Sequence, residues 1–269
     1  MVSFKDAVRP ILTDDELDFF KGSYDVVGDI AILEIDPELR HKEKEIASVL
    51  LHLHKRIHTV VRKEGSHTGV CRLQQYIVLA GEEGLVTEHK ENGCRFRLDI
   101  SQVYFSPRTG SERLRVVTLA GPEEKVLVLF AGCGPFVIPL AKKGCAVVAV
   151  EINEKGCDYL RENIRLNKVS ASVYCDDVRT VSLSSMFDRI IMPLPSDSHM
   201  FLDVITKWCH AGTVVHFYTF VGMCQTFKEN ADVEAFLREK LGNITILAVV
   251  PCGDIAVHAF RMCFDVKVL

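Results

Sequence analysis

The segment 126–152 contains residue types that could hold a nucleoside-bearing cofactor. An apolar run ends in Phe130, and Gly132 and Gly134 follow it before a helix-like stretch. Glycines at such a turn let the backbone approach a ligand without interference from a Cβ atom. Glu151 comes nineteen residues after Gly132, at the end of the next apolar run, where its carboxylate would suit a ribose diol. The two glycines alone are also compatible with a tight turn that binds no nucleotide.

The pattern differs from that of a dinucleotide site. A dinucleotide fingerprint needs a third glycine where this chain has Phe136, and Pro135 precedes it. S-adenosylmethionine has no phosphate to seat at a helix N-terminus, so it fits this turn better. Asp177, at the end of the following apolar run, could accept a hydrogen bond from an adenine amino group or could be a helix N-cap. The order of glycine turn, Glu151 and Asp177 therefore predicts the nucleoside-binding edge of a class I methyltransferase.

Regularly alternating elements must position these residues. In the second half of the chain, short apolar runs alternate with helix-length amphipathic segments, which predicts a mostly parallel sheet with helices on both faces. The final segment, 255–269, has no helix before it and is expected to return antiparallel to the strand it follows. We therefore predict an α/β, doubly wound, Rossmann-like domain over 99–269. The predicted strands before the final segment are 126–132, 146–152, 171–177, 189–195, 213–220 and 244–250.

The first part of the chain has a different pattern. Thr13 is a candidate N-cap for a short helix, and the alternating residues around Gly28 predict a pair of strands. Residues 39–54 carry apolar side chains at helical spacing. Further strands are predicted at 57–63, 74–81 and 95–100. Together these elements predict a smaller α+β domain over 1–98, which would dock RNA.

Composition excludes several classes of protein. Of the 269 residues, 48% are apolar and 25% are charged, as in ordinary globular proteins. The ten cysteines form no CxxC pair and lie mostly within apolar runs, so we expect free thiols in a reducing compartment and no metal. The N-terminus lacks the pattern of a signal peptide, and no apolar stretch reaches the roughly 18 residues of a membrane span. A cytoplasmic monomer without a membrane anchor is the expectation.

The net charge of −4 does not favour nucleic-acid binding, but its distribution is uneven. The segment 51–63 contains no acidic residue. A solvated helix and strand face would explain this as well as a phosphate-contacting surface would. The basic residues and histidines of the segment are His52, His54, Lys55, Arg56, His58, Arg62 and Lys63.

The chain also resembles a known family over nearly its whole length. It is similar to the archaeal and eukaryotic tRNA (guanine-37-N1)-methyltransferases in SYDVVGDIAIL, CRLQQYIVLAGEE, HKENGCRFRLDISQVYFSPRTGSERLRV, LFAGCGPFVIPLAKKGC, ENIRLNKV and DRIIMPLP. The resemblance implies methyl transfer from S-adenosylmethionine to N1 of guanine 37, with the tRNA anticodon stem-loop as partner. It also implies a form that lacks the small N-terminal domain of many relatives.

The same resemblance implies roles for individual residues. Glu112 resembles the base that removes the proton from guanine N1, and Arg72 resembles the arginine that stabilises charge on O6. Glu112 could instead be a surface partner of Arg115, and Arg72 could be a phosphate contact. The residues expected at the cofactor are Phe105, Phe130, Gly132, Gly134, Glu151, Asp177, Pro193 and Leu194. The expected RNA contacts are Arg56, Arg62, Lys63, Arg108 and Arg113.

Two departures from the family pattern keep alternatives open. Val128 stands where relatives usually have an acid, and Pro193 replaces an asparagine that helps to hold the target base. A related group transfers the aminocarboxypropyl arm of the same cofactor to a tricyclic guanine derivative or, in other cases, acts on wyosine-pathway intermediates in tRNA. Leu194 with Pro195, and the GPF of the glycine turn, favour the methyl branch. A non-catalytic tRNA-binding scaffold is the alternative from a different class.

Overall fold

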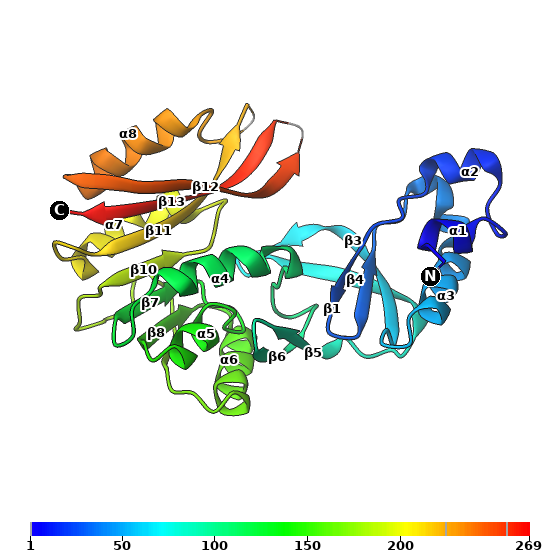
Figure 1. Ribbon diagram of the computed structural model, residues 1–269, viewed down its shortest axis with the longest axis horizontal. Coiled ribbons are helices and arrows are strands. Elements are labelled where there is room, and N and C mark those ends of the chain that lie inside the picture. The colour runs from blue at the N-terminus through cyan, green and yellow to red at the C-terminus, as the bar shows by residue number, and fades with distance from the viewer. Residues whose placement is uncertain (1, 224, 257) are drawn as a thin grey trace. The chain divides into compact units, whose positions relative to one another are not determined.

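The computed structural model describes residues 2–223, 225–256 and 258–269 (Figure 1). The chain divides into two compact units. The N-terminal unit consists of Met1–Glu91 and Arg95–Arg108, and the C-terminal unit of Asn92–Cys94 and Thr109–Leu269. A domain boundary at 98/99 stays a prediction.

The N-terminal unit begins with two short helices, α1 (Phe4–Val8) and α2 (Asp14–Phe19). Thr13 caps α2 as expected, because its hydroxyl accepts from the Glu16 N–H while the Glu16 carboxylate accepts from the Thr13 N–H at 2.7 Å. The predicted helix at 39–54 is a 3-10 helix (Pro37–Lys42) followed by α3 (Glu43–Leu53).

Two small sheets complete this unit. The first has the order β1-β2-β3-β4, and the second pairs β5 with β6. The expected strand pair around Gly28 is confirmed as an antiparallel hairpin of β1 and β2. Buried side chains from α1, α3 and the larger sheet, such as Ile46, Leu50 and Val60, form the core. The α+β character of the unit is confirmed. The strands are β1 (Tyr24–Val27), β2 (Ile30–Leu33), β3 (Thr59–Thr68), β4 (Leu73–Gly81), β5 (Val86–Glu91) and β6 (Cys94–Asp99).

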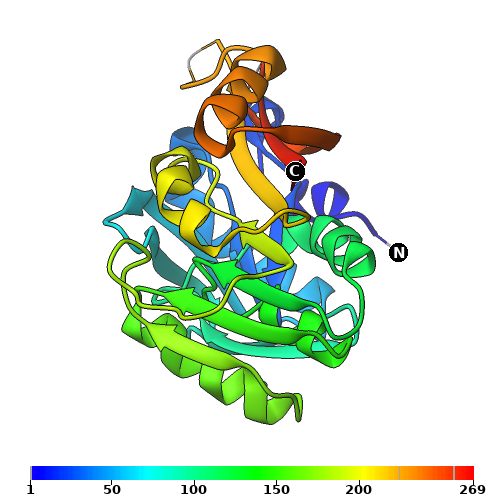
Figure 2. The same ribbon diagram turned by 90° about the vertical axis from the view of Figure 1, so that its left-hand side faces the viewer.

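The C-terminal unit contains a seven-stranded sheet of order β12-β13-β11-β10-β7-β8-β9. Neighbours from β11 to β9 are parallel, whereas β13 lies between β12 and β11 and runs antiparallel to both. Every predicted strand is present, and the antiparallel return of the final segment is confirmed. The strands rotate progressively across the sheet (Figure 2). They are β7 (Lys125–Leu129), β8 (Ala146–Glu151), β9 (Ser172–Cys175), β10 (Arg189–Met192), β11 (Val214–Gly222), β12 (Ile244–Ala256) and β13 (Ala259–Val268).

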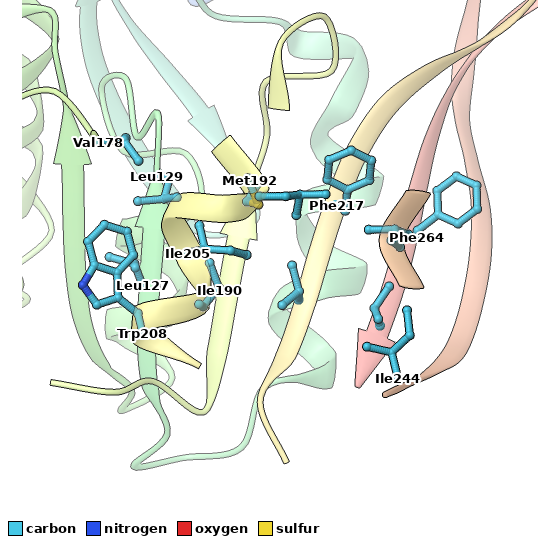
Figure 3. Close-up of a cluster of buried hydrophobic side chains, with 14 of the residues drawn as sticks. Leu127, Leu129, Val178, Ile190, Met192, Ile205, Trp208, Phe217, Ile244 and Phe264 are labelled. Atoms are coloured by element: carbon cyan, nitrogen blue, oxygen red, sulfur yellow. The ribbon is translucent and has the colours of Figure 1, made fainter. Parts of the chain in front are cut away.

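Helices cover both faces of this sheet. One face is covered by α7 (Leu202–Ile205) and α8 (Asn230–Leu241). Buried side chains of both helices and Trp208 belong to one apolar cluster with Leu127 and Leu129 of β7 (Figure 3). Side chains alternate across a strand, so neighbouring positions point to the other face. On that second face, Tyr218 and Asp265 form hydrogen bonds with side chains of α4 (Gly110–Leu119). The other α-helices described in this unit are α5 (Val137–Lys142) and α6 (Glu154–Leu166). The doubly wound α/β prediction is therefore confirmed.

Two further features of the described residues concern membrane spans and cysteines. None of the described helices is both long and apolar enough to cross a membrane. None of the nine described cysteines forms a disulfide, and Cys133, Cys145, Cys157 and Cys263 are among the buried ones. Cys224 lies outside the described residues.

Candidate functional site

Most residues predicted to bind a cofactor follow the ends of four neighbouring strands. Strands β10, β7, β8 and β9 are adjacent and parallel, so their carboxyl ends share one edge of the sheet. Open α/β sheets bind ligands outside this edge. Below, "the carboxyl edge" means the seven residues that end or follow these strands. They are Phe130, Gly132, Gly134, Glu151, Asp177, Pro193 and Leu194.

The turn after β7 has an unusual backbone. Phe130, Gly132 and Gly134 have φ angles of 52°, 55° and 96°. A positive φ is rare for phenylalanine, and such strained residues cluster at functional sites. A Cβ atom on Gly134 would lie 2.4 Å from Leu160 Cδ1, so the turn packs closely against α6. The glycines therefore allow a left-handed turn at the carboxyl edge that a side chain at position 134 would block.

Glu151 is the last residue of β8 and is almost fully buried. Its carboxylate accepts from the N–H of Gly132 at 2.6 Å and from the N–H of Asn153 at 2.8 Å. Burial raises the pKa of Glu151, and the two backbone N–H groups oppose that shift. A carboxylate offers about four acceptor positions, so these bonds are compatible with additional ribose hydroxyl donors.

Asp177 follows β9 and organises a tight turn. Its Oδ1 accepts from the Arg179 N–H at 2.8 Å, and its carbonyl accepts from the N–H of Thr180 and Val181. The Arg179 guanidinium also pairs with the carboxylate and holds the pKa of Asp177 below its ordinary value. The alternative role of a helix N-cap is not realised, because residues 178–180 form a turn and no helix begins there. A contact with adenine stays a prediction.

Pro193 and Leu194 follow β10 in a compact loop. The Met192 carbonyl accepts from the Leu194 N–H at 2.9 Å and from the Ser198 hydroxyl at 2.9 Å. Pro193 has no N–H to donate, so it cannot replace the amide donor of an asparagine side chain. Val128, the other departure, is fully buried in β7, where an unpaired carboxylate would be costly.

Glu112 lies in the first turn of α4 and is only 8% exposed. Arg115 donates to both of its oxygens, from Nε at 2.7 Å and from Nη2 at 2.8 Å. The Tyr218 hydroxyl donates to Oε1 at 2.6 Å. In the sheet register Phe217 pairs with the last residue of β10, so Tyr218 lies one residue further toward the carboxyl ends. Glu112 therefore lies at the same end of the sheet as the carboxyl edge.

The pair with Arg115 is part of a larger set of contacts. Arg115 Nη1 donates to Asp265 Oδ2 at 2.6 Å, and Asp265 Oδ1 lies 2.6 Å from His216 Nδ1. His216 Nε2 lies 2.6 Å from Arg189 Nη1, and Arg189 pairs with Glu124. We call Glu112, Arg115, Asp265, His216 and Arg189 the buried polar network.

Part of this network offers metal-ligating atoms. One atom each of His216, Cys263 and Asp265 lie within 4.8 Å of one another. However, Arg115 and Arg189 donate to this cluster and already supply positive charge there. We therefore interpret the cluster as an ion-pair network. The absence of a metal from the protein stays a prediction.

Arg72 and Phe105 line a small pocket within the N-terminal unit. The pocket has a volume of about 80 Å³, and Lys63, Tyr76 and Tyr104 also line it. Arg72 has a φ of 52°, a conformation that costs free energy in a non-glycine residue. Phe105 packs against His89 with ring centroids 4.9 Å apart. A strained arginine beside aromatic rings is compatible with recognition of a purine.

The five residues predicted to contact RNA differ in accessibility. Arg56 is exposed, and the side chain of Arg108 is 63% exposed while Nε pairs with Asp25 at 2.6 Å. Lys63 is partly exposed, and Arg113 is buried. Arg62 is also buried, and its guanidinium pairs with Glu43 and Glu64. An RNA contact by Arg62 stays a prediction, but its two carboxylate partners already balance its positive charge without RNA.

Three residues near Glu112 were not predicted from the sequence, namely Tyr218, His216 and Asp265. A signal was present, because His216 stands between Val215 and Phe217 and Asp265 between Phe264 and Val266, all four of them apolar. Polar groups buried in central strands need partners, so these positions indicate a polar network. The sequence alone does not reveal which helix supplies the partner.

Comparisons with known proteins show two family matches. Residues 87–240 match the TRM5/TYW2 methyltransferase domain, and residues 4–84 match the TYW2 N-terminal domain. The two matches together cover most of the chain.

Three relatives illustrate the similarity. The tRNA (guanine(37)-N(1))-methyltransferase Trm5b of Pyrococcus abyssi is 43% identical over 203 residues, which is 75% of this chain and 61% of that protein. The tRNA(Phe) (4-demethylwyosine(37)-C(7)) aminocarboxypropyltransferase of Pyrococcus horikoshii is 33% identical over 84% of each chain. The solved complex of aTrm5 with tRNALeu has a TM-score of 0.88 at 32% identity, over 99% of this chain and 78% of that chain. This chain thus spans less than two thirds of the first of these relatives.

Proposed function

Because the chain belongs to the TRM5/TYW2 methyltransferase family, we propose that it is an S-adenosylmethionine-dependent tRNA (guanine-37-N1)-methyltransferase. The observation that carries this proposal is the carboxyl edge, which gathers a strained glycine turn, a buried glutamate and an aspartate at the ends of parallel strands. Glu112 lies at the same end of that sheet. A nucleoside-binding edge beside a carboxylate base is what the reaction requires.

The carboxyl edge fits the chemistry of the cofactor. Glu151 would hold the ribose hydroxyls, because its carboxylate lies beside the glycine turn and is fixed by two backbone N–H groups. Asp177 would accept from the adenine amino group. Phe130, Pro193 and Leu194 would supply apolar contacts around the adenosine and methionine moieties, and Phe105 would contribute a further aromatic contact. When bound, S-adenosylmethionine supplies an electrophilic methyl group on its sulfonium.

Glu112 acts as the base in the proposed reaction. Guanine N1 carries a proton at neutral pH, and that proton must leave as N1 gains the methyl group. An ionised carboxylate held in fixed geometry is suited to accept it. By its place in the family motif, Arg72 stabilises the negative charge that gathers on guanine O6. Proximity and orientation supply much of the remaining rate.

Arg56, Lys63 and Arg108 are the proposed contacts to tRNA. Arg56 and Arg108 are exposed cations in the N-terminal unit and can reach phosphates. We leave Arg62 and Arg113 out of this set. The Arg62 guanidinium is buried between two carboxylates, and Arg113 is only 4% exposed. The tRNA anticodon stem-loop is the proposed partner.

Aminocarboxypropyl transfer is the second candidate function. It is favoured by the match of residues 4–84 to the TYW2 N-terminal domain and by the similarity to the aminocarboxypropyltransferase over 84% of both chains. The higher identity to Trm5b favours methyl transfer. The GPF of the glycine turn and Leu194 with Pro195 also favour the methyl branch.

Mass spectrometry of nucleosides distinguishes these functions. The purified chain is incubated with S-adenosylmethionine and a tRNA transcript that carries guanine at position 37. We expect 1-methylguanosine from this transcript and none from a matched transcript with adenine at that position. Transfer only to tRNA that carries 4-demethylwyosine would favour the second candidate. Cofactor binding without any modified nucleoside would support a non-catalytic scaffold.

A further inference from the structure

The buried polar network alternates in charge from one end to the other. Glu112 is the anion at the helix end, Arg115 is the cation beside it, and Asp265 is the next anion. Arg189 is the cation at the far end and is compensated by Glu124. Glu112, Asp265 and Arg189 are each less than 9% exposed, so their charges depend on one another for compensation.

The contacts of His216 determine which ring nitrogen carries the proton. A guanidinium can only donate, so His216 Nε2 must accept from Arg189 Nη1. The proton of the neutral ring is then on Nδ1, which donates to Asp265 Oδ1 at 2.6 Å. Burial lowers the pKa of His216, which agrees with a neutral ring. His216 therefore orients Asp265 without adding a charge.

Other groups packed around Glu112 are neutral at ordinary pH. Burial raises the pKa of the Tyr218 hydroxyl on β11 well above its usual value. Burial, with a contribution from Glu112, raises the pKa of the Cys252 thiol on β12 to about 12. Burial also raises the pKa of the Cys263 thiol on β13. The charged side chains connected to Glu112 by the described contacts of this unit are thus Arg115, which donates to Glu112, and Asp265, which accepts from Arg115.

We propose that Arg115 and Asp265 are positioning residues that tune Glu112 as a base, an inference that rests on the proposed function. Arg115 holds the buried carboxylate ionised before transfer and fixes its orientation through two hydrogen bonds. Asp265 acts at the next stage. When Glu112 takes the N1 proton it becomes neutral, and Arg115 keeps a compensating anion in Asp265. Tyr218 adds a smaller stabilisation of the ionised carboxylate through its hydroxyl.

The two residues have opposite effects on proton uptake. Removing the cation in Arg115→Met leaves two buried anions, so Glu112 takes up a proton at higher pH. Removing the anion in Asp265→Asn leaves Arg115 dependent on Glu112 alone, so protonation of Glu112 becomes harder and occurs at lower pH. A merely structural role would not produce shifts of opposite sign.

The test measures single-turnover methyl transfer to tRNA as a function of pH. We expect the acid limb of the profile to move up by about one pH unit or more in Arg115→Met, and down by a similar amount in Asp265→Asn. The plateau rate should also fall in Asp265→Asn, since the weaker base accepts the proton less readily. The dissociation constant for S-adenosylmethionine should change by less than about twofold, because neither residue belongs to the carboxyl edge.

Matched controls come from α6. Arg161 pairs with Asp158 at 3.6 Å across one helix turn, but both side chains are largely exposed. Arg161→Met and Asp158→Asn therefore repeat the two substitutions where charges are screened by water. Both should leave the acid limb in place.

Folded Arg115 and Asp265 variants that keep the wild-type acid limb would overturn the proposal, as would shifts of the same sign. If Asp265→Asn fails to fold, Tyr218→Phe decides the matter, since it removes only a hydroxyl. A small shift of the acid limb to higher pH in Tyr218→Phe supports the proposal, and an unchanged limb overturns it.

A measurement without catalysis separates this inference from the proposed function. Carbon-13 NMR of glutamate carboxyl groups, with Glu112 assigned from Glu112→Gln, follows proton uptake directly. The same order of pH midpoints, Arg115→Met above wild type and Asp265→Asn below, is expected even if the wild-type chain methylates no tRNA. Failure of methylation with these midpoints would reject the function alone. Unchanged midpoints would reject the inference alone.

Discussion

The carboxyl edge and the buried polar network are built in different ways. Each residue of the carboxyl edge ends a strand or follows one within five residues, so the order of strands in the sheet is enough to gather them. The network instead joins side chains from α4 and from within strands, and Arg115 and Asp265 are 150 positions apart. The proposed cofactor contacts therefore depend on turns, whereas the proposed base depends on the packed interior. Substitutions in the two regions should therefore have different effects on the rate of methyl transfer and on cofactor affinity.

The largest expected effect is at the base. Glu112→Gln keeps the shape of the side chain but cannot take the N1 proton, so the rate of methyl transfer should fall by about 10²- to 10⁴-fold. Affinity for S-adenosylmethionine should stay within about twofold, because the carboxyl edge is intact. Quench-flow kinetics and calorimetry measure the two quantities. A rate near that of the wild type would remove Glu112 from the base role.

The reverse pattern is expected at the carboxyl edge. Glu151→Ala removes a buried carboxylate proposed to bind ribose hydroxyls, so affinity for S-adenosylmethionine should fall by about 10- to 100-fold. Calorimetry measures this loss, and Glu162→Ala at a half-buried position of α6 is a control with the same change of side chain. Unchanged affinity in Glu151→Ala would contradict the ribose assignment.

The network should also make stability depend on pH. Burial lowers the pKa of His216, whereas in the unfolded chain it titrates near 6.5. The unfolded state then binds more protons below that pH, so stability is fully present above about pH 6.5 and is lost as pH falls, by up to about 1.4 kcal/mol per pH unit. In His216→Asn this loss should be much smaller. Urea unfolding at several pH values between about 5 and 7.5 measures it, and equal slopes would count against a neutral buried histidine.

The smallest effects concern RNA contacts in the N-terminal unit. Arg56→Ala and Lys63→Ala should each weaken tRNA binding several-fold and reduce the salt dependence of log K by about one. Arg62→Gln should instead lower stability and leave the salt dependence unchanged, because Arg62 is buried between Glu43 and Glu64. Fluorescence anisotropy at several salt concentrations measures the slopes. A loss of slope in Arg62→Gln would restore it to the RNA surface.

Local patterns in the sequence predicted much of the fold. Apolar runs of strand length marked every strand of the large sheet, and the lack of a helix before residue 255 predicted the antiparallel return of β13. The capping pattern at Thr13 was equally local. These features succeeded because strand periodicity and caps are set by neighbours in sequence.

The surroundings of Glu112 could not be predicted in the same way. In the sequence, Arg115 lies one helix turn from Glu112. How far this pair is exposed to solvent depends on the strands that cover it. Asp265 and His216 meet because β13 inserts beside β11, a choice made by the whole sheet. Arg62 shows the same limit, since a basic stretch does not reveal which guanidinium folds inward onto carboxylates.

One kinetic comparison tests the division between binding and base most directly. Single-turnover methyl transfer is measured for Glu112→Gln and Glu151→Ala over a range of S-adenosylmethionine concentrations, up to saturation of each variant. We predict that Glu151→Ala recovers to within about threefold of the wild-type rate at saturation, whereas Glu112→Gln stays slower by about 100-fold or more at every concentration. Recovery of both variants, or of neither, would contradict this account.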